Sequence, residues 1–260
     1  MTTCCASRLT HIDLFSGIGG FALAAKSAGF QTIGFSEIEP YACKVLKKHW
    51  PDVPNYGDVR NVPAVKCDLI TGGFPCQPFS VAGKQRGAND DRFLWPAMLD
   101  AIKRCQPAWV LGENVTGLIG MELARVLADM EGIGFCTQPL IIPACAVGGM
   151  HRRDRVWVVA YSAENRRGCV RVHVSEHQQS GTGSLLNKLD FEIPASASEA
   201  DFCEPSDGLS RRLARNGWRA FGNAIVPQVA ETILNGIARV THKAGAEASA
   251  TRDNRTPKTL

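Results

Sequence analysis

Long hydrophobic runs are absent from this sequence of 260 residues. No stretch approaches the roughly 20 continuous apolar residues that a membrane-spanning helix needs. Residues 1–9 also lack the apolar core of a secretory signal peptide. We therefore expect a cytoplasmic protein with no membrane partner.

The spacing that metal-binding and redox cysteines require is absent as well. The chain has ten cysteines, but none of them forms a Cys-x-x-Cys pair. Structural zinc sites and thioredoxin-like redox motifs depend on such pairs. We therefore expect no metal and mostly reduced, structural thiols.

The chain has no strong excess of charge of either sign. A formal net charge of +4 and a pI near 8.5 permit nucleic-acid binding without demanding it. With 45% apolar residues, the chain can bury a core as one large domain, or as one domain with a small appendage. The arginines gather at 152–155, 166–171 and 211–219.

A glycine-rich turn stands near the beginning of the chain. His11–Phe15 is predicted to form a strand and Phe21–Lys26 a helix, with Ser16–Gly20 between them. Glycines at such a turn let backbone amides and the helix N-terminus approach a ligand closely. Gly17, Gly19 and Ala22 also match the Gly-x-Gly-x-x-Ala fingerprint of dinucleotide-binding folds, although a pattern this short is weak alone.

Two acidic residues follow this turn. Glu37 ends the predicted strand Thr32–Phe35, 37 − 17 = 20 residues after the first glycine, where an acid can accept hydrogen bonds from ribose hydroxyls. The alternative is an acid that leads a helix, and Glu39 before Pro40 fits that interpretation better. Asp58 follows a third predicted short strand and is either an adenine ligand or a turn residue.

Cys76 is the candidate nucleophile. The apolar strand Asp68–Thr71 stops at two glycines, and Pro75 and Gln77 then bracket the thiol on a turn. A lone cysteine is more often a small buried hydrophobe, so this position alone does not decide. The polar, glycine-bearing loop 81–92 that follows suits a lid over a phosphate backbone.

The rest of the chain alternates helices and strands. Glu113 stands at the exit of the predicted strand 108–112, and in open parallel sheets ligands bind at that carboxyl edge. Arg153 and Arg155 lead into the strand 156–160, where alternation would point both to one side, although such clusters are most often solvated. Helices are predicted at 40–50, 94–105, 121–130 and 228–240, and a further strand at 136–142.

Taken in order, these motifs resemble the DNA cytosine-5 methyltransferases. The resemblance runs from Asp13 to about Ile233, excluding an irregular insert, and it is that of a compact bacterial or phage type, as found in restriction-modification. It rests on Asp13–Phe21, Gly73-Phe74-Pro75-Cys76-Gln77, Glu113-Asn114-Val115, Arg153-Asp154-Arg155 and Gly222-Asn223-Ala224. It implies an α/β, Rossmann-like methyltransferase fold with a mostly parallel sheet, using S-adenosyl-L-methionine.

The resemblance also implies catalytic roles. Cys76 would add to carbon 6 of a flipped-out cytosine and activate carbon 5. Glu113 would act as the acid at N3, Arg155 would hold O2, and Arg153 would position the nucleophile or a phosphate.

The implied cofactor site draws on most of the chain. Phe15 and Ile38 would pack on the adenine, Glu37 would bind the ribose, and Asp58 the adenine amino group. The whole predicted set is Phe15, Ser16, Gly17, Ile18, Gly20, Glu37, Ile38, Asp58, Val59, Pro75, Leu94, Asn223 and Ala224.

The resemblance divides the chain into four parts. Residues 9–162 are expected to form the catalytic, cofactor-binding domain, 163–218 a reduced target-recognition insert, 219–241 a C-terminal segment that returns to the catalytic domain, and 242–260 a disordered tail. Only 222 − 155 − 1 = 66 residues separate Arg155 from Gly222, so the region that reads DNA is small. His151 stands where many relatives carry glutamine, and a glycine common between Arg92 and Trp95 is missing, which leaves the register of Leu94 open.

The expected partner is double-stranded DNA, and the expected state is a monomer. An RNA cytosine-5 methyltransferase of the same family and a non-catalytic DNA-binding homologue are the alternatives. A dinucleotide-dependent oxidoreductase would explain the glycine turn, but neither Cys76 nor Glu113.

Overall fold

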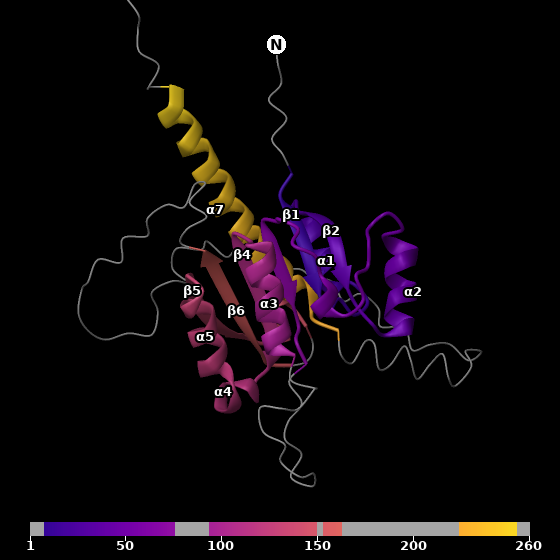
Figure 1. Ribbon diagram of the computed structural model, residues 1–260. Helices are drawn as coiled ribbons and strands as arrows, with labels where there is room; N and C mark the ends of the chain where they lie inside the picture. Colours follow the sequence, from indigo (N-terminus) through magenta and orange to yellow (C-terminus); the bar gives the residue numbers. More distant parts are fainter. Residues whose placement is uncertain (1–7, 76–93, 150–152, 163–223, 254–260) are drawn as a thin grey trace, which may run out of the picture.

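A six-stranded sheet forms the centre of the computed structural model, which describes residues 8–75, 94–149, 153–162 and 224–253 (Figure 1). The strand order is β2-β1-β3-β4-β6-β5. The strands are β1 (Thr10–Leu14), β2 (Gln31–Ser36), β3 (Leu69–Gly72), β4 (Trp109–Val115), β5 (Phe135–Ile142) and β6 (Arg155–Ser162).

Strands β1 to β4 are parallel, and β6 is antiparallel to both of its neighbours, β4 and β5. The prediction of an α/β fold with a mostly parallel sheet is therefore confirmed. Because β6 runs the other way, its first residue, Arg155, pairs with Val115 at the end of β4. The carboxyl edge of the sheet thus collects the ends of β1–β4 and the beginning of β6.

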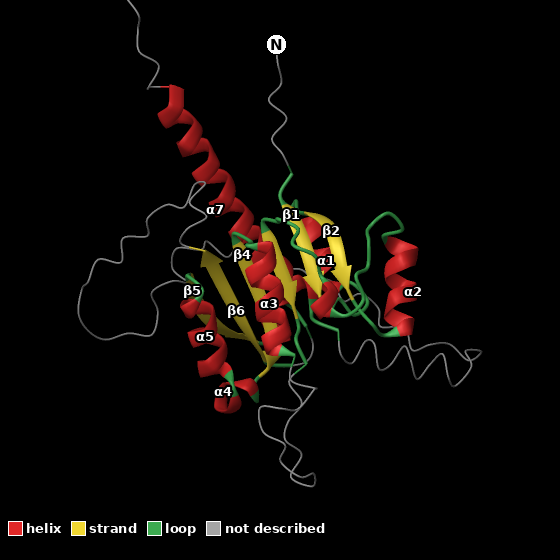
Figure 2. Cartoon of the chain, in the orientation of Figure 1, coloured by secondary structure: helices red, strands yellow, loops and turns green. Residues whose placement is uncertain are grey.

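Helices cover both faces of the sheet (Figures 1 and 2). One face packs against α3 (Trp95–Cys105), α5 (Leu123–Gly132) and the short helix η1 (Val59–Asn61), around a core that includes Ile12, Ile70, Trp95 and Met98. The other face packs against α1 (Gly20–Ser27), α7 (Pro227–Asp253) and η3 (Ala144–Val147), where Leu69, Leu111 and Trp157 are buried. Helix α2 (Pro40–His49) lies beside β2, and α4 (Leu118–Met121) follows β4.

Local sequence explains where these helices begin. Pro40 and Pro96 stand in the first turns of α2 and α3, where the missing N–H costs nothing. The Glu39 carboxylate caps α2 by accepting from the Ala42 N–H at 2.8 Å. Glu39 is thus the helix-leading acid, which leaves Glu37 for another role.

The structure departs from the predictions in three places. The short strand predicted just before Gly57 does not form: the described residues between α2 and Gly57 contain a single bridge, from Asn55 to Phe35. The helix predicted at 121–130 is split into α4 and α5.

The third departure concerns the predicted disordered tail. Helix α7 continues through Asp253, so the prediction of disorder was wrong for residues 242–253. These residues include four alanines and no proline, and alanine has the highest helix propensity. The first half of α7 packs on α1, and Ser27 Oγ donates a hydrogen bond to Glu231.

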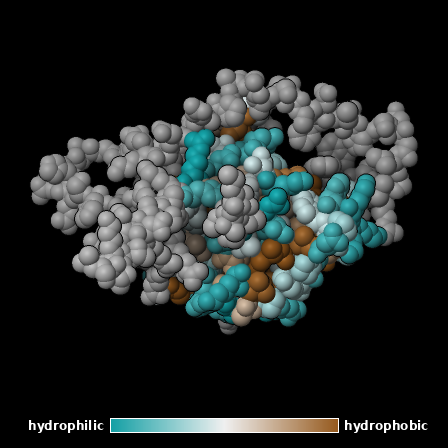
Figure 3. Space-filling model, turned by 90° about the horizontal axis from the view of Figure 1, so that it is seen from above, coloured by the Kyte–Doolittle hydropathy of each residue, from teal (hydrophilic) through white to brown (hydrophobic). Residues whose placement is uncertain are grey.

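Within the described ranges, no helix combines the length and the apolar character needed to cross a membrane. Figure 3 shows a largely hydrophilic described surface from above, with a narrow hydrophobic area between polar side chains. The predicted recognition insert at 163–218 lies outside the described residues, as do 219–223 of the C-terminal segment.

Candidate active site

The glycine turn after β1 has a left-handed backbone at several positions. Gly17 and Gly19 have φ values of 53° and 89°, and Phe15 between strand and turn has φ 54°. A Cβ on Gly19 would come within 2.6 Å of Trp50, and one on Gly20 within 2.8 Å of Ile225. The turn is therefore wedged between α2 and the segment that leads into α7.

Glu37 joins this turn to the end of β2. Its Oε2 accepts from the Gly17 N–H at 2.7 Å, and its Oε1 accepts from the N–H groups of Ile38 and Glu39 at 2.8 and 2.7 Å. The structure thus brings together two predicted site residues, Glu37 and Gly17, that are far apart in the sequence.

The other predicted cofactor residues surround the same edge. Ile38 is 68% exposed although it is a large apolar residue, so it offers a bare contact surface. Asp58 Oδ1 accepts from the N–H and Nε of Arg60, at 2.9 and 3.0 Å. These contacts lower the pKa of Asp58, with the backbone N–H of Arg60 as the main cause. Val59 is buried in the core.

Glu113 in β4 is the central acid of the site. Its Oε1 forms an ion pair with Arg155 Nε at 3.0 Å, and the two side chains are only 11% and 20% exposed. Burial raises the pKa of Glu113 above its ordinary value, while the charges of Arg155 and Arg153 oppose that rise. A carboxyl group held in this way can carry a proton for a ligand.

The backbone that leads to Cys76 is held against Glu113. Asn114 Nδ2 donates to the Phe74 carbonyl at 2.9 Å, and Asn114 Oδ1 accepts from the Val115 N–H at 2.9 Å. A Cβ on Gly73 would lie 3.2 Å from Glu113 Oε2, so only a residue without a side chain fits easily there. Cys76 lies outside the described residues, and this described segment ends at Pro75, two residues after Gly73.

Arg153 contacts the segment that leads into α7, and its charge acts on Glu113. Its Nη2 donates to the Ala224 carbonyl at 2.8 Å, and burial lowers its pKa. Arg153 has φ 28° and lies before β6, so the predicted strand alternation with Arg155 was wrong, although both charges act on Glu113. Asn223 lies outside the described residues; Leu94 is described and directly precedes α3.

A buried polar network joins β1, β2 and β3. Thr71 Oγ1 donates to Asp13 Oδ1 at 3.1 Å and lies 2.8 Å from His11 Nε2, while His11 Nδ1 lies 3.0 Å from Thr32 Oγ1. Because the Thr71 hydroxyl gives its one proton to Asp13, it accepts from His11 Nε2. Burial lowers the pKa of His11 to about 3 and raises that of Asp13 to about 8.

Sequence reasoning missed several of these residues. Asn114 was quoted in a motif without a role, and Asn55 and the network of His11, Asp13 and Thr71 were not singled out. A polar residue inside an apolar strand, such as Asp13 or Thr71, was the available signal for the network. No comparable signal marks Asn55.

The arrangement suits group transfer to a ligand bound at the carboxyl edge. Within the described ranges, no cluster of three or more His, Cys, Asp or Glu side chains could hold a metal ion. A nucleotide-type turn, an acid at the end of β2 and a buried acid in β4 line one edge of the sheet. Together with the mostly parallel sheet, these features are typical of an α/β methyltransferase.

The chain belongs to the C-5 cytosine-specific DNA methylase family, whose sequence model matches residues 9–200. It is similar to the type II methyltransferase M.AplI of Arthrospira platensis, with 39% identity over 60% of this chain and 46% of that protein. It is also similar to the type II methyltransferase M.NgoMIV of Neisseria gonorrhoeae, with 34% identity over 71% of this chain and 62% of that protein.

Solved structures have the same fold. A DNMT2 mutant of Spodoptera frugiperda superposes with a TM-score of 0.52 and 23% identity, over 60% of this chain and 51% of that one. The chain spans about half the length of M.AplI, so the relatives contain much sequence that it does not match.

Proposed function

We propose that this chain is a DNA cytosine-5 methyltransferase that transfers a methyl group from S-adenosyl-L-methionine to carbon 5 of a flipped-out cytosine. The observation that carries the proposal is the buried Glu113, paired with Arg155 and adjacent to the backbone that leads to Cys76. Family membership supports the same reaction.

The residues at the end of β1 and β2 fit this cofactor. The Glu37 carboxylate has about four lone-pair sites, and three backbone N–H groups leave one for a ribose hydroxyl. Ile38 and the half-buried Phe15 offer apolar surface for the adenine, and Asp58 Oδ2 is the oxygen left for its amino group. When bound there, S-adenosyl-L-methionine supplies an electrophilic methyl group. Ser16, Gly17, Ile18, Gly20, Val59, Pro75, Leu94, Asn223 and Ala224 complete the proposed site.

The remaining residues would activate the base. The Cys76 thiolate adds to carbon 6, and Glu113 gives a proton to N3 as electron density builds on the ring. Carbon 5 would then take the methyl group, with S-adenosyl-L-homocysteine as the leaving group. Water would take the proton from carbon 5, the bond between carbon 6 and the Cys76 sulfur would break to release the thiolate, and the N3 proton would return to Glu113. Arg155 uses Nε and Nη1 for Glu113 and the Asp154 carbonyl, which leaves Nη2 for O2 of the base. Arg153 binds the Ala224 carbonyl, and its charge acts on Glu113.

Reaching the base requires double-stranded DNA to release it from the stack, at a cost of a few kcal/mol. The loop 77–92 is proposed to close behind the flipped base, and the insert 163–218 to contact the DNA. We propose that the protein acts as a monomer in the cytoplasm.

The test is transfer of radiolabelled methyl groups from S-adenosyl-L-methionine to duplex DNA by the purified chain. We expect Cys76→Ser to abolish transfer while sparing cofactor binding, because the nucleophile is lost and the cofactor contacts are not. We also expect a covalent adduct with DNA that carries 5-fluorocytosine, since fluorine cannot leave as a proton does.

Three outcomes would count against the proposal. Undiminished transfer by the Cys76→Ser variant would exclude the covalent mechanism. Transfer to RNA but not to DNA would favour the RNA methyltransferase, and cofactor and DNA binding without transfer would favour a non-catalytic homologue.

A further inference from the structure

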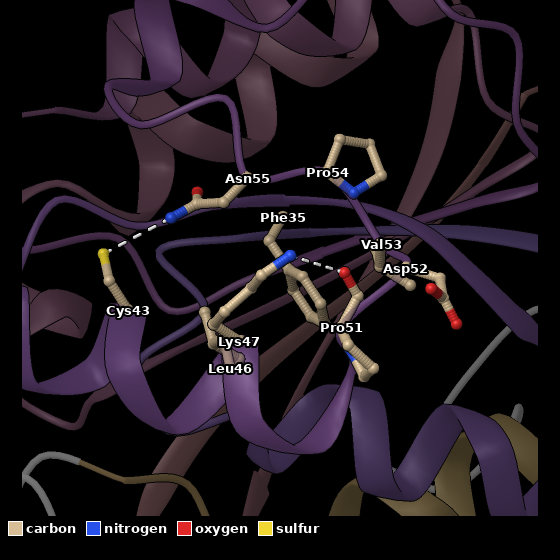
Figure 4. A pocket seen from close by; sticks show the side chains of 9 residues that line it. All are labelled: Phe35, Cys43, Leu46, Lys47, Pro51, Asp52, Val53, Pro54 and Asn55. Atoms are coloured by element: carbon tan, nitrogen blue, oxygen red, sulfur yellow. Dashed lines mark hydrogen bonds between the residues drawn. The ribbon is translucent and has the colours of Figure 1, made fainter.

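Asn55 is exposed, yet its side chain makes four hydrogen bonds, of which Figure 4 shows the one to Cys43. Its Oδ1 accepts from the N–H of Glu37 at 3.0 Å and from the N–H of Gly57 at 3.1 Å. Its Nδ2 donates to the carbonyl of Glu37 at 3.0 Å and to the Cys43 sulfur at 3.3 Å. One amide thus holds both backbone groups of Glu37.

These contacts connect the segment at Glu37 to the segment at Gly57, and the proposed cofactor site needs both segments in fixed positions. Glu37 directly follows β2 and contacts the glycine turn through Gly17, whereas Gly57 directly precedes Asp58. Backbone bonds between Phe35 and the segment Pro54–Tyr56 bring the segments together, and Asn55 joins them at the point where the ladder stops.

The position of the amide depends on its hydrogen bonds rather than on packing. Asn55 is exposed and borders a cavity of about 250 Å³ between α2 and the segment 51–55 (Figure 4). Truncating it to alanine therefore removes four hydrogen bonds without opening a hole in the core.

We propose that Asn55 is a positioning residue that fixes the separation between the ribose contact at Glu37 and the adenine contact at Asp58. This inference rests on the proposed function. Without the amide, the backbone of Glu37 loses an acceptor and a donor, and it is no longer tied through Asn55 to the N–H of Gly57. A cofactor would then have to order the two segments on binding, which costs affinity.

The test compares Asn55→Ala, Asn55→Asp and the control Asn61→Ala, which removes an exposed asparagine side chain from η1. Calorimetry on the full chain should show about tenfold weaker binding of S-adenosyl-L-methionine by Asn55→Ala, which corresponds to about 1.4 kcal/mol. Asn55→Asp keeps the acceptor for both N–H groups and should lose less. Asn61→Ala should bind like the wild type.

A second ligand separates positioning from a general loss of structure. 5′-Methylthioadenosine contains the adenine and ribose without the amino-acid part, so Asn55→Ala should weaken its binding by the same factor. In methyl transfer, KM for the cofactor should rise about tenfold, while kcat at saturating cofactor and KM for DNA stay within twofold, about 0.4 kcal/mol.

Wild-type affinity in Asn55→Ala would overturn the inference and leave the proposed function intact. Equal losses in kcat and in both KM values would also overturn it, because they indicate a damaged fold. A wild-type chain that binds no S-adenosyl-L-methionine would instead overturn the proposed function.

Discussion

The two halves of the candidate site are built from different parts of the polypeptide. At the ends of β1 and β2, the site is formed mainly by backbone groups. Left-handed glycines shape the turn, and three N–H groups orient the Glu37 carboxylate. At the ends of β3 and β4 and the beginning of β6, side chains dominate, above all the pair of Glu113 and Arg155. We expect changes in the first half to alter cofactor affinity and changes in the second to alter the rate of the chemical step.

The largest effect is expected from Glu113→Gln. Glutamine keeps the shape but cannot give a proton to the base, so kcat should fall by roughly 10²–10⁴-fold while cofactor affinity is kept. The measurements are single-turnover methyl transfer and calorimetry.

The pH profile sharpens this prediction. Because burial raises the pKa of Glu113, activity that needs its proton should be present below that pKa and lost as pH rises through it. The matched control Glu131→Gln changes an exposed carboxylate on α5 and should keep the wild-type rate and profile. A Glu113→Gln variant with the wild-type rate would remove Glu113 from the chemistry.

A smaller loss of activity is expected from Gly19→Ala, which disturbs the part of the site at the ends of β1 and β2. The added Cβ would meet Trp50 at 2.6 Å in a left-handed backbone, which costs of the order of 1–3 kcal/mol. Thermal unfolding should show the loss of stability, and calorimetry a weaker affinity for S-adenosyl-L-methionine.

Gly29→Ala is the control for Gly19→Ala. Gly29 is also left-handed, at φ 87°, but nothing lies within 4 Å of its added Cβ. It lies after α1, away from the turn, so stability should fall without a specific loss of cofactor affinity. Equal losses of cofactor affinity in both variants would mean that the turn at Gly19 has no specific role in binding the cofactor.

The smallest effect on methyl transfer is expected from Asp13→Asn, which tests the buried network of His11, Asp13 and Thr71 through the stability of the fold. Asp13 has its pKa raised from 3.8 to about 8, so the folded state keeps a proton that the unfolded state has already lost. Stability from this group should therefore fall as pH rises from about 4 to about 8. Asparagine cannot titrate, so the variant should gain stability relative to the wild type over that range.

Thermal or urea unfolding at several pH values measures this difference. Asp100→Asn, at an exposed position on α3, should leave the pH dependence unchanged. An Asp13→Asn variant whose stability follows the wild-type pH curve would show that Asp13 does not hold its proton. His11 acts in the opposite direction: its pKa is lowered from 6.5 to about 3, so stability is lost as pH falls through that range.

The sequence allowed the prediction of most of the fold and of the residues at strand ends. Spacing was enough to single out Glu37, because an acid that binds ribose typically follows the glycine turn by about 20 residues. Pro40 and Glu39 marked the start of α2. The extension of α7 was missed because small and charged residues were read as disorder, although alanine favours helix.

Contacts that depend on tertiary structure could not be predicted. The pair of Glu113 and Arg155 requires the antiparallel register of β4 and β6, which the sequence does not specify. Asn55 contacts Glu37 only because the segment after α2 folds back beside Phe35, and its own neighbours carry no pattern that indicates this.

The direction of β6 has a consequence for how the protein can be extended. Because β6 begins at the catalytic edge, its last residue, Ser162, lies at the opposite edge, opposite Phe135 in the sheet and next to Ala108. A strand of eight residues at roughly 3.3 Å each separates these two edges by about 25 Å. A module fused after Ser162 would thus start far from the reacting groups, whereas one inserted before Arg155 would start among them.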